Sequence, residues 1–298
     1  MKQDIYQTIT DRIVSQIEAG TKPWEMPWAG ATGRVSRPLR HNGLPYSGVN
    51  ILILWIAASE KGYASQYWMT YKQATELGGQ VRKGEKAQHI VYANSYSKTE
   101  TGTDGEETER NVSFLRSYAV FNADQIESLP AHYYPTPATA HRNEEARREV
   151  AEAFAKASGA DIRHGGDRAF YTPAHDFVQM PRFEQFRSSE DYYSTLFHEM
   201  THWTKAESRL NREFGRKRWG DEGYAMEELV AELGASFLCA DLGLEPATTP
   251  RDDHASYLAN WLQVLKNDKR AIFTAASYAS KAAEYLHSLQ AAPVAEAA

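Results

Sequence analysis

The segment from Thr195 to Trp203 constrains this chain more than any other, because it contains the pattern His-Glu-x-x-His. On an α-helix, positions i and i+4 lie one above the other, so His198 and His202 can bind one metal ion together. Glu199 follows about 100° round the helix, where it can reach a metal-bound water. Neutral imidazoles suit zinc, and a catalytic zinc takes three protein ligands and keeps a fourth position for water. The segment therefore predicts a zinc site with Glu199 as general base.

The flanks of this pattern favour a helix. No Gly or Pro occurs from residue 182 to 212, and apolar side chains recur at helical spacing. They are Tyr193, Leu196, Phe197, Met200 and Trp203. The alternative is a chance match, because two histidines four residues apart are also found on ordinary helix surfaces. A second helix that carries carboxylates favours the metal.

That second helix runs through Tyr224–Leu233 and carries Glu228 and Glu232 at positions i and i+4. A site with two histidines needs one carboxylate on the metal, and a ligating histidine usually donates its other N–H to a second carboxylate. We assign Glu228 as the third ligand and Glu232 as the partner of a histidine, and Glu227 and Glu232 remain rivals for the ligand position. The spacing resembles the third-ligand helix of gluzincin metallopeptidases. The alternative is a set of acids on a solvated helix face.

Length and composition indicate a globular protein. The 298 residues can form two domains, and 42% of them are hydrophobic. No apolar run approaches the length of a membrane span, and the start of the chain lacks the apolar region of a signal peptide, so we expect no membrane association. Cys239 is the single cysteine, which excludes an intrachain disulfide and is typical of a cytoplasmic protein.

The charge is unevenly distributed along the chain. Between Lys22 and Lys98, ten basic and four acidic residues leave a net charge of +6; since the whole chain carries −6, the remainder carries −12. Such asymmetry is a sign of a polyanion-binding region joined to another domain.

The pattern of elements predicts an α+β fold with two domains. Residues 1–130 are predicted to form a small antiparallel sheet with helices, residues 131–141 a linker punctuated by prolines, and residues 142–298 a helix-rich domain around the metal. The first domain has predicted helices at 3–18, 51–59 and 71–77, strands at 89–97 and 112–121, and an exposed loop at 98–110. The second has predicted strands at 168–171 and 176–180, and helices at 144–157, 253–266 and 268–288.

Aromatic residues lie among the basic residues of the first domain, which is what single-stranded nucleic acid requires. Cations follow the phosphates, and exposed rings stack on unpaired bases. The candidate DNA-binding residues are Trp24, Trp28, Arg34, Arg37, Arg40, Tyr46, Asn50, Trp68, Arg82, Lys83 and Lys86. The alternative is that most of these rings are core residues and the charges are a solvated surface.

Several motifs resemble those of ArdC-type antirestriction proteins of conjugative plasmids, along essentially the whole chain. In the first domain they are Pro23-Trp24, Pro27-Trp28, Tyr46–Asn50, Val81–Lys86 and Tyr118–Asn122. In the second they are Phe170-Tyr171, Met180-Pro181, Tyr193–Thr204, Arg209–Arg212 and Glu227–Glu232. The resemblance implies an N-terminal domain that binds single-stranded DNA, a C-terminal zincin-like domain, and protection of incoming plasmid DNA from host restriction.

Two mechanisms fit these expectations. In the first, zinc on His198, His202 and Glu228 lowers the pKa of its water towards about 7, Glu199 takes the proton, and the substrate is a DNA-bound or restriction-related protein. In the second, the protein coats DNA and its metal site is structural or vestigial. The spacing does not exclude Mn²⁺ or Co²⁺ in place of zinc.

Overall fold

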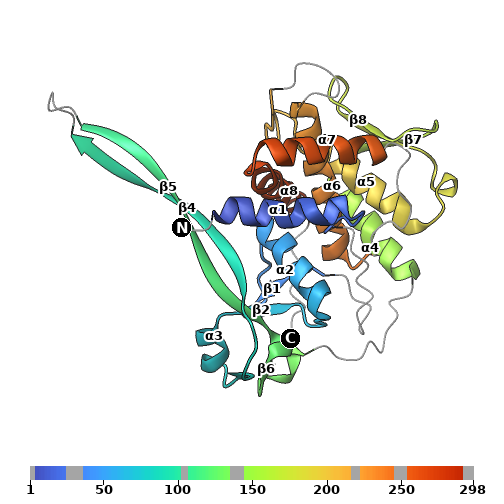
Figure 1. Cartoon of the computed structure of the whole chain (residues 1–298). Helices are drawn as coiled ribbons and strands as arrows, with labels where there is room; N and C mark the ends of the chain where they lie inside the picture. Colours follow the sequence, from blue (N-terminus) through green and yellow to red (C-terminus); the bar gives the residue numbers. More distant parts are fainter. Residues whose placement is uncertain are drawn as a thin grey trace, which may run out of the picture.

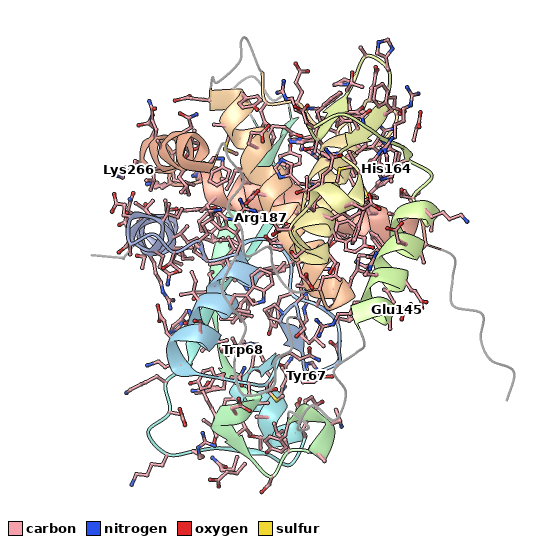
Figure 2. All side chains as sticks on the ribbon, turned by 90° about the vertical axis from the view of Figure 1, so that its right-hand side faces the viewer. Tyr67, Trp68, Glu145, His164, Arg187 and Lys266 are labelled. Carbon is pink, nitrogen blue, oxygen red and sulfur yellow. The ribbon has the colours of Figure 1, made fainter. Side chains whose placement is uncertain are left out.

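The structure is a computed structural model of the chain, and it describes residues 4–24, 36–101, 107–134, 144–215, 222–244 and 254–290. Its strands belong to small mixed and antiparallel sheets, and most of the body of the protein is helical (Figure 1). The α+β fold class predicted from the sequence is confirmed. In Figure 2 the part around Tyr67 and Trp68 lies below the helical part that contains His164 and Lys266.

The first helix, α1 (Ile5–Glu18), lies within the predicted helix at 3–18. The side chain of Asp4 caps it by accepting from the backbone N–H groups of Tyr6 and Gln7. Its buried side is Thr10, Ile13, Val14 and Ile17. The Thr10 hydroxyl donates to the carbonyl of Lys269 at 2.8 Å, which fixes α1 against the C-terminal helices.

The four-stranded sheet has the order β1-β2-β5-β4. Its strands are β1 (Leu39–Arg40), β2 (Tyr67–Met69), β4 (Gln88–Thr101) and β5 (Glu107–Asn122). β1 is parallel to β2, and the other pairs are antiparallel. β4 and β5 form a long two-stranded ribbon that projects from the body of the protein (Figure 1).

The ribbon corrects the predicted loop at 98–110. Strand pairing continues from Gln88↔Val120 as far as Thr101↔Glu107, and residues 102–106 lie outside the described part. In a two-stranded ladder the facing backbone groups pair with each other and the outer ones bind water, so the ladder extends without the apolar alternation by which strands are predicted from sequence.

Two helices, two short strands and two 3₁₀ helices complete the described part of this region. α2 (Val49–Lys61) is buried from Ile51 to Ala57, as its apolar sequence predicts, and α3 (Tyr71–Glu76) begins at a capping box. The strands β3 (Gln80–Val81) and β6 (Ile126–Glu127) pair beside α3. The single-turn 3₁₀ helices are η1 (Ala123–Gln125), η2 (Ala131–Tyr133) and, farther along the chain, η3 (Phe183–Gln185).

The C-terminal part contains a three-stranded sheet and five α-helices among the described residues. The sheet has the order β7-β9-β8, formed by β7 (Asp161–His164), β8 (Phe170–Thr172) and β9 (Phe177–Met180). β8 and β9 are the two predicted strands, whereas β7 was missed. The helices are α4 (Glu144–Ala157), α5 (Ser189–Trp203), α6 (Glu222–Leu242), α7 (His254–Asn267) and α8 (Ala271–Ser288).

One hydrophobic core connects the two parts of the chain. Trp24 contacts Trp261 of α7 with ring centroids 5.9 Å apart, and Trp55 of α2 contacts Phe237 of α6 at 5.7 Å. The start of the predicted linker is also folded, since Tyr133 is buried and its hydroxyl donates to the carbonyl of His41 at 2.6 Å. The boundaries at 130 and 142 remain a prediction. In the described part of the chain, no helix is long and apolar enough to cross a membrane.

Candidate metal centre and nucleic-acid surface

Helix α5 contributes two buried histidines to the candidate metal site. Its first turn is capped by the hydroxyl of Ser188, which accepts from the N–H of Asp191. His198 and His202 are one turn apart, with ring centroids separated by 4.8 Å, and both are buried. Glu199 is also buried on this helix.

Helix α6 packs against α5 and brings Glu228 to both histidines. One carboxylate oxygen of Glu228 lies 3.4 Å from Nε2 of His198, and the other lies 3.5 Å from Nε2 of His202. Two ligand atoms that are each about 2.1 Å from a tetrahedral ion are separated by about 3.4 Å. Ligand atoms of these three residues lie within 4.8 Å of one another, so the donor set fits a divalent ion.

The opposite nitrogen of each histidine faces another carboxylate. Nδ1 of His202 lies 3.0 Å from Oε1 of Glu227, within hydrogen-bond distance. Nδ1 of His198 lies 3.3 Å from Oε2 of Glu232, but it is not aligned for a hydrogen bond within the described chain. Such outer carboxylates fix the orientation of metal-binding imidazoles. Glu227 and Glu232, the rivals of Glu228, therefore lie on the Nδ1 sides, whereas Glu228 lies on both Nε2 sides.

Arg212 fixes Glu227, and it is not among the site residues predicted from the sequence. Its guanidinium donates from Nε to Oε2 at 2.8 Å and from Nη2 to Oε1 at 2.9 Å, and the side chain is fully buried. Further bonds join it to the carbonyl of Thr201 and the hydroxyl of Thr204. The sequence offers only a basic residue at the end of the motif Arg209–Arg212, in an irregular segment between two helices, and this does not show the contact with Glu227.

The buried carboxylates dominate the electrostatics of this centre. Burial opposes a charge on His202, but Glu228 and Glu227 outweigh it and raise the pKa of His202 to about 9. Burial by itself raises the pKa of Glu227, whereas Arg212 and His202 lower it to about 2. Burial likewise opposes ionisation of Glu228, but the two histidines hold its pKa far below the usual range. The centre is therefore built to hold positive charge.

The sheet beside α5 has an edge strand. Among the described strands β8 pairs only with β9, and both strands contact α5. Tyr171 in β8 donates its hydroxyl hydrogen to Asp176 at 2.9 Å, and Arg209 binds the same carboxylate. His164 and His175 are exposed, and Nε2 of His164 lies 2.8 Å from the hydroxyl oxygen of Tyr192.

Four predicted DNA-binding residues are buried instead of presented to solvent. Trp24 and Trp68 are each 1% exposed, and Tyr46 packs with its hydroxyl donating to the carbonyl of Trp68. Arg37 forms a buried ion pair with Asp241 of α6. A buried ring offers no face to a base, and a paired buried guanidinium offers no charge to a phosphate, because both groups contribute to the core between the two parts of the chain. In this conformation these four are structural residues.

The other predicted DNA-binding residues have different surroundings. Asn50 is half-buried and exchanges two hydrogen bonds with the backbone of Val91, so it fixes α2 to β4. Arg40, Arg82, Lys83 and Lys86 are exposed. Trp28 and Arg34 lie outside the described residues.

Tyr92 and Tyr118 form an exposed aromatic pair on the ribbon, and neither is among the site residues predicted from the sequence. Their side chains are 47% and 42% exposed, and their ring centroids are 6.2 Å apart. Ile90 is opposite Tyr118 and Tyr92 is opposite Arg116, so the two tyrosines are diagonal neighbours on one face. Arg116 is exposed beside them. The alternation of side chains along each strand does not show that Tyr92 and Tyr118 are neighbours. That follows only from the register in which β4 and β5 pair.

Both parts of the chain match known protein families. Residues 3–121 match the family described as the N-terminal domain of anti-restriction factor ArdC, and residues 149–278 match a family described as zincin-like metallopeptidase. The chain is 40% identical over 292 residues to protein y4eC of Sinorhizobium fredii, covering 96% of this chain and 92% of that protein. It is 36% identical over 305 residues to the DNA primase TraC of Escherichia coli, covering 96% of this chain but only 27% of the primase.

Solved structures of similar sequence have the same fold. The metal-free crystal structure of antirestriction protein ArdC from plasmid R388 is 46% identical, has a TM-score of 0.79, and is matched over 97% of this chain and 98% of that one. The Mn(II)-bound structure of ArdC from the same plasmid is 45% identical, with a TM-score of 0.75 and coverage of 97% and 99%. With an ArdC-type N-terminal region, a zincin-like C-terminal region and this likeness over nearly its whole length, the chain belongs to the ArdC family of antirestriction proteins.

Proposed function

We propose that this protein binds single-stranded DNA, protects incoming plasmid DNA from restriction in the recipient cytoplasm, and carries a metal-dependent peptidase centre. The observation that carries the proposal is the buried group His198, His202 and Glu228, in a chain that also exposes aromatic and basic residues on a projecting ribbon. Tethering to DNA would raise the effective concentration of a DNA-bound protein substrate.

The face of the ribbon that carries Tyr92, Tyr118 and Arg116 supports the DNA-binding part of the proposal. Exposed rings stack on unpaired bases and tolerate any sequence, and an adjacent guanidinium contacts phosphates or stacks itself. The three side chains share one face of the strand pair. A single strand therefore meets two rings and one cation without any rearrangement of the backbone.

More cations lie where the ribbon meets the body. Lys86 precedes β4 by two residues, and its carbonyl accepts from the side chain of Gln125, just after β5. Arg82 lies in the same turn and donates to the carbonyl of Asp124. Lys86 precedes Tyr92 by six residues, which span about 20 Å in a strand, so exposed cations extend from Arg116, opposite Tyr92, to the base of the ribbon. Neutralisation of phosphates by such cations makes binding strongly salt-dependent.

The same histidine and carboxylate donors support a divalent metal. Two imidazoles and one carboxylate are a donor set that zinc prefers, and a Mn(II)-bound structure exists for the R388 relative, so we propose Zn²⁺ with Mn²⁺ as an alternative. When bound, such an ion polarises a carbonyl group and makes water more acidic. His198, His202 and Glu228 would hold it, with Glu227 and Glu232 orienting the two rings.

Glu199 is the proton carrier in this proposal. It is buried on the same helix as the two histidines. Its carboxylate takes a proton from water as the water attacks a peptide carbonyl, and it returns that proton to the leaving amine. The edge strand β8 offers unpaired backbone groups beside α5, to which an extended peptide can add as a strand.

The test separates the two parts of the proposal in a conjugation assay with a restricting recipient. Three variants are compared with the wild type: Glu199→Gln, the pair Tyr92→Ser with Tyr118→Ser, and Tyr71→Ser, which removes an exposed ring of α3, away from the exposed face of the ribbon and from β8. Metal content, melting temperature and affinity for a fluorescent oligonucleotide are measured for each purified protein. The ribbon pair should lower DNA affinity by about tenfold or more, and Glu199→Gln should leave it unchanged.

The outcomes assign protection to one part or the other. If Glu199→Gln abolishes protection with DNA and metal binding intact, peptide hydrolysis is required. If it protects normally and only the ribbon variant fails, the protein protects by coating DNA. A wild-type protein that binds neither single-stranded DNA nor a divalent metal would refute the proposal.

A further inference from the structure

A lysine from the N-terminal region reaches the metal centre. Nζ of Lys22 lies 3.8 Å from Oε1 of Glu232, and both side chains are more than 90% buried. The other oxygen of Glu232 lies 3.3 Å from Nδ1 of His198. We propose that Lys22 is a positioning residue of the metal centre, which holds the Glu232 carboxylate where it orients His198. This inference rests on the proposed metal site.

Packing on both sides of Lys22 fixes its position independently of the ion pair. Helix α1 ends before it, and the N–H groups of Gly20 and Thr21 donate back to the carbonyls of Ile17 and Gln16. Gly20 has φ of 81°, a left-handed conformation that glycine adopts without strain. On the other side, Trp24 is buried against Trp261. The contacts before and after Lys22 therefore hold its backbone close to α6.

The charges around Glu232 explain why a cation is needed there. Glu228 and Glu232 are four residues apart on α6, and Glu227 adds a third buried carboxylate. Arg212 binds Glu227, whereas Lys22 approaches Glu232 from the opposite end of the chain. A buried carboxylate that loses a cationic partner takes up a proton or rotates towards water, because an uncompensated buried charge is costly. Either change removes the acceptor that faces Nδ1 of His198.

If Lys22 has this role, both parts of the chain contribute residues to the metal centre. The zincin-like match covers residues 149–278, and Lys22 lies far outside it, within the ArdC-type N-terminal match. The region proposed to bind DNA thus supplies an outer residue of the centre. This arrangement gives a physical reason for the continuous core that joins α1 and the Trp24 segment to α6 and α7.

The direction in which metal affinity changes when Lys22 is removed distinguishes a positioning role from simple charge repulsion. Lys22 is a cation close to a site for another cation, so its loss would by Coulomb repulsion alone tighten metal binding. Loss of positioning acts in the opposite direction, since outer partners of metal-binding histidines typically contribute 10–100-fold in metal affinity. A weakened affinity on removal of Lys22 is therefore specific to positioning.

The experiment measures Mn²⁺ and Zn²⁺ affinity of the full-length protein by competition with a chromophoric chelator. The variants are Lys22→Met, Lys22→Arg, Glu232→Gln, and Lys22→Met combined with Glu232→Gln. Lys266→Met is the matched control, because it removes the same charge from an exposed ion pair with Glu18. Melting curves in EDTA show whether each variant folds without metal.

Lys22→Met should weaken metal binding by about 3–10-fold, whereas Lys22→Arg and the Lys266 control should stay within about twofold of the wild type. In the Glu232→Gln background, loss of Lys22 should add almost nothing, because the two residues act as one unit. That double variant leaves neither charge buried alone, so it also serves if Lys22→Met does not fold. Additive losses, an unchanged affinity or a tighter affinity would overturn the inference. Absence of metal binding by the wild type would instead refute the proposed metal site together with it.

Discussion

Gly234 of α6 lies directly against Thr201 of α5. A Cβ atom at position 234 would be 2.6 Å from both Cγ2 and Oγ1 of Thr201, closer than real Cβ contacts. The absence of a side chain at 234 therefore allows the two helices to approach at the level of the metal centre. This approach is what places Glu228 between Nε2 of His198 and Nε2 of His202.

Gly234→Ala should destabilise the protein although alanine is the better helix former. Propensity alone would add about 1 kcal/mol of stability, whereas overpacking in a core typically costs about 1–3 kcal/mol. Urea unfolding in EDTA measures the free energy of unfolding, and a chelator competition measures metal affinity, which should also fall. Thr201→Ala removes both clashing atoms and should restore part of the loss in the double variant. If the Gly234→Ala protein is more stable than the wild type, α5 and α6 can accommodate a methyl group at this position.

Arg212→Met should be among the most damaging single changes in the described chain. It leaves the buried carboxylate of Glu227 without its bidentate partner, and breaking a buried ion pair typically costs about 3–5 kcal/mol. Metal affinity should also fall, by about 10–100-fold, because Glu227 contacts Nδ1 of His202. Chemical denaturation and metal competition measure the two effects. Arg212→Lys keeps the charge but loses the fork, so it should lie between the wild type and Arg212→Met; equal stability of all three would contradict the prediction.

The metal-free protein should lose stability as the pH rises from about 6.5 to 9. Burial disfavours the charged form of His202, but Glu228 and Glu227 raise its pKa from 6.5 to about 9. A raised pKa contributes stability that is fully present below the unfolded value and is lost as the pH passes through the folded value. Melting temperatures in EDTA should fall over this window. The His175→Asn protein, changed at an exposed histidine, should show the same fall.

Metal binding should follow the opposite trend over the same window. The ion requires neutral His202, so below pH 9 it competes with a proton, and the apparent affinity should rise towards tenfold per pH unit. The stabilisation by Mn²⁺, measured as the difference between melting temperatures with metal and with EDTA, should therefore grow with pH. A difference that is constant from pH 6.5 to 9 would show that His202 carries no competing proton.

The sequence predicts what depends on local periodicity, and it misses what depends on partners that are far apart. The helix that carries His198 and His202 and the helix that carries Glu228 follow from their spacing. Arg212 could not be assigned, because its contact with Glu227 exists only after α5 and α6 pack. Tyr92 and Tyr118 become an exposed pair only through the register of β4 and β5.

The aromatic residues were the main source of error, since a tryptophan among lysines and arginines suits a core as well as a DNA surface. Trp24 and Trp68 lie among basic residues in the sequence, yet both are 1% exposed. Their neighbours in space are other rings, Trp261 for Trp24 and Tyr63 for Trp68. Burial on folding is a property of the assembled fold, and composition alone does not decide it.

Trp24→Ala should therefore act on stability and leave DNA contacts alone. Removing a fully buried tryptophan typically costs about 3–5 kcal/mol, since a cavity opens against Trp261. At a temperature where the variant remains folded, its affinity for single-stranded DNA should match the wild type within about twofold, and its melting temperature should be much lower. Tyr92→Ser should show the reverse pattern, because an exposed ring adds little to folding but much to stacking. Paired measurements of melting temperature and oligonucleotide affinity decide between the two assignments. If the Trp24→Ala protein is folded but its DNA affinity is reduced tenfold, Trp24 contacts DNA and its assignment as a core residue is wrong.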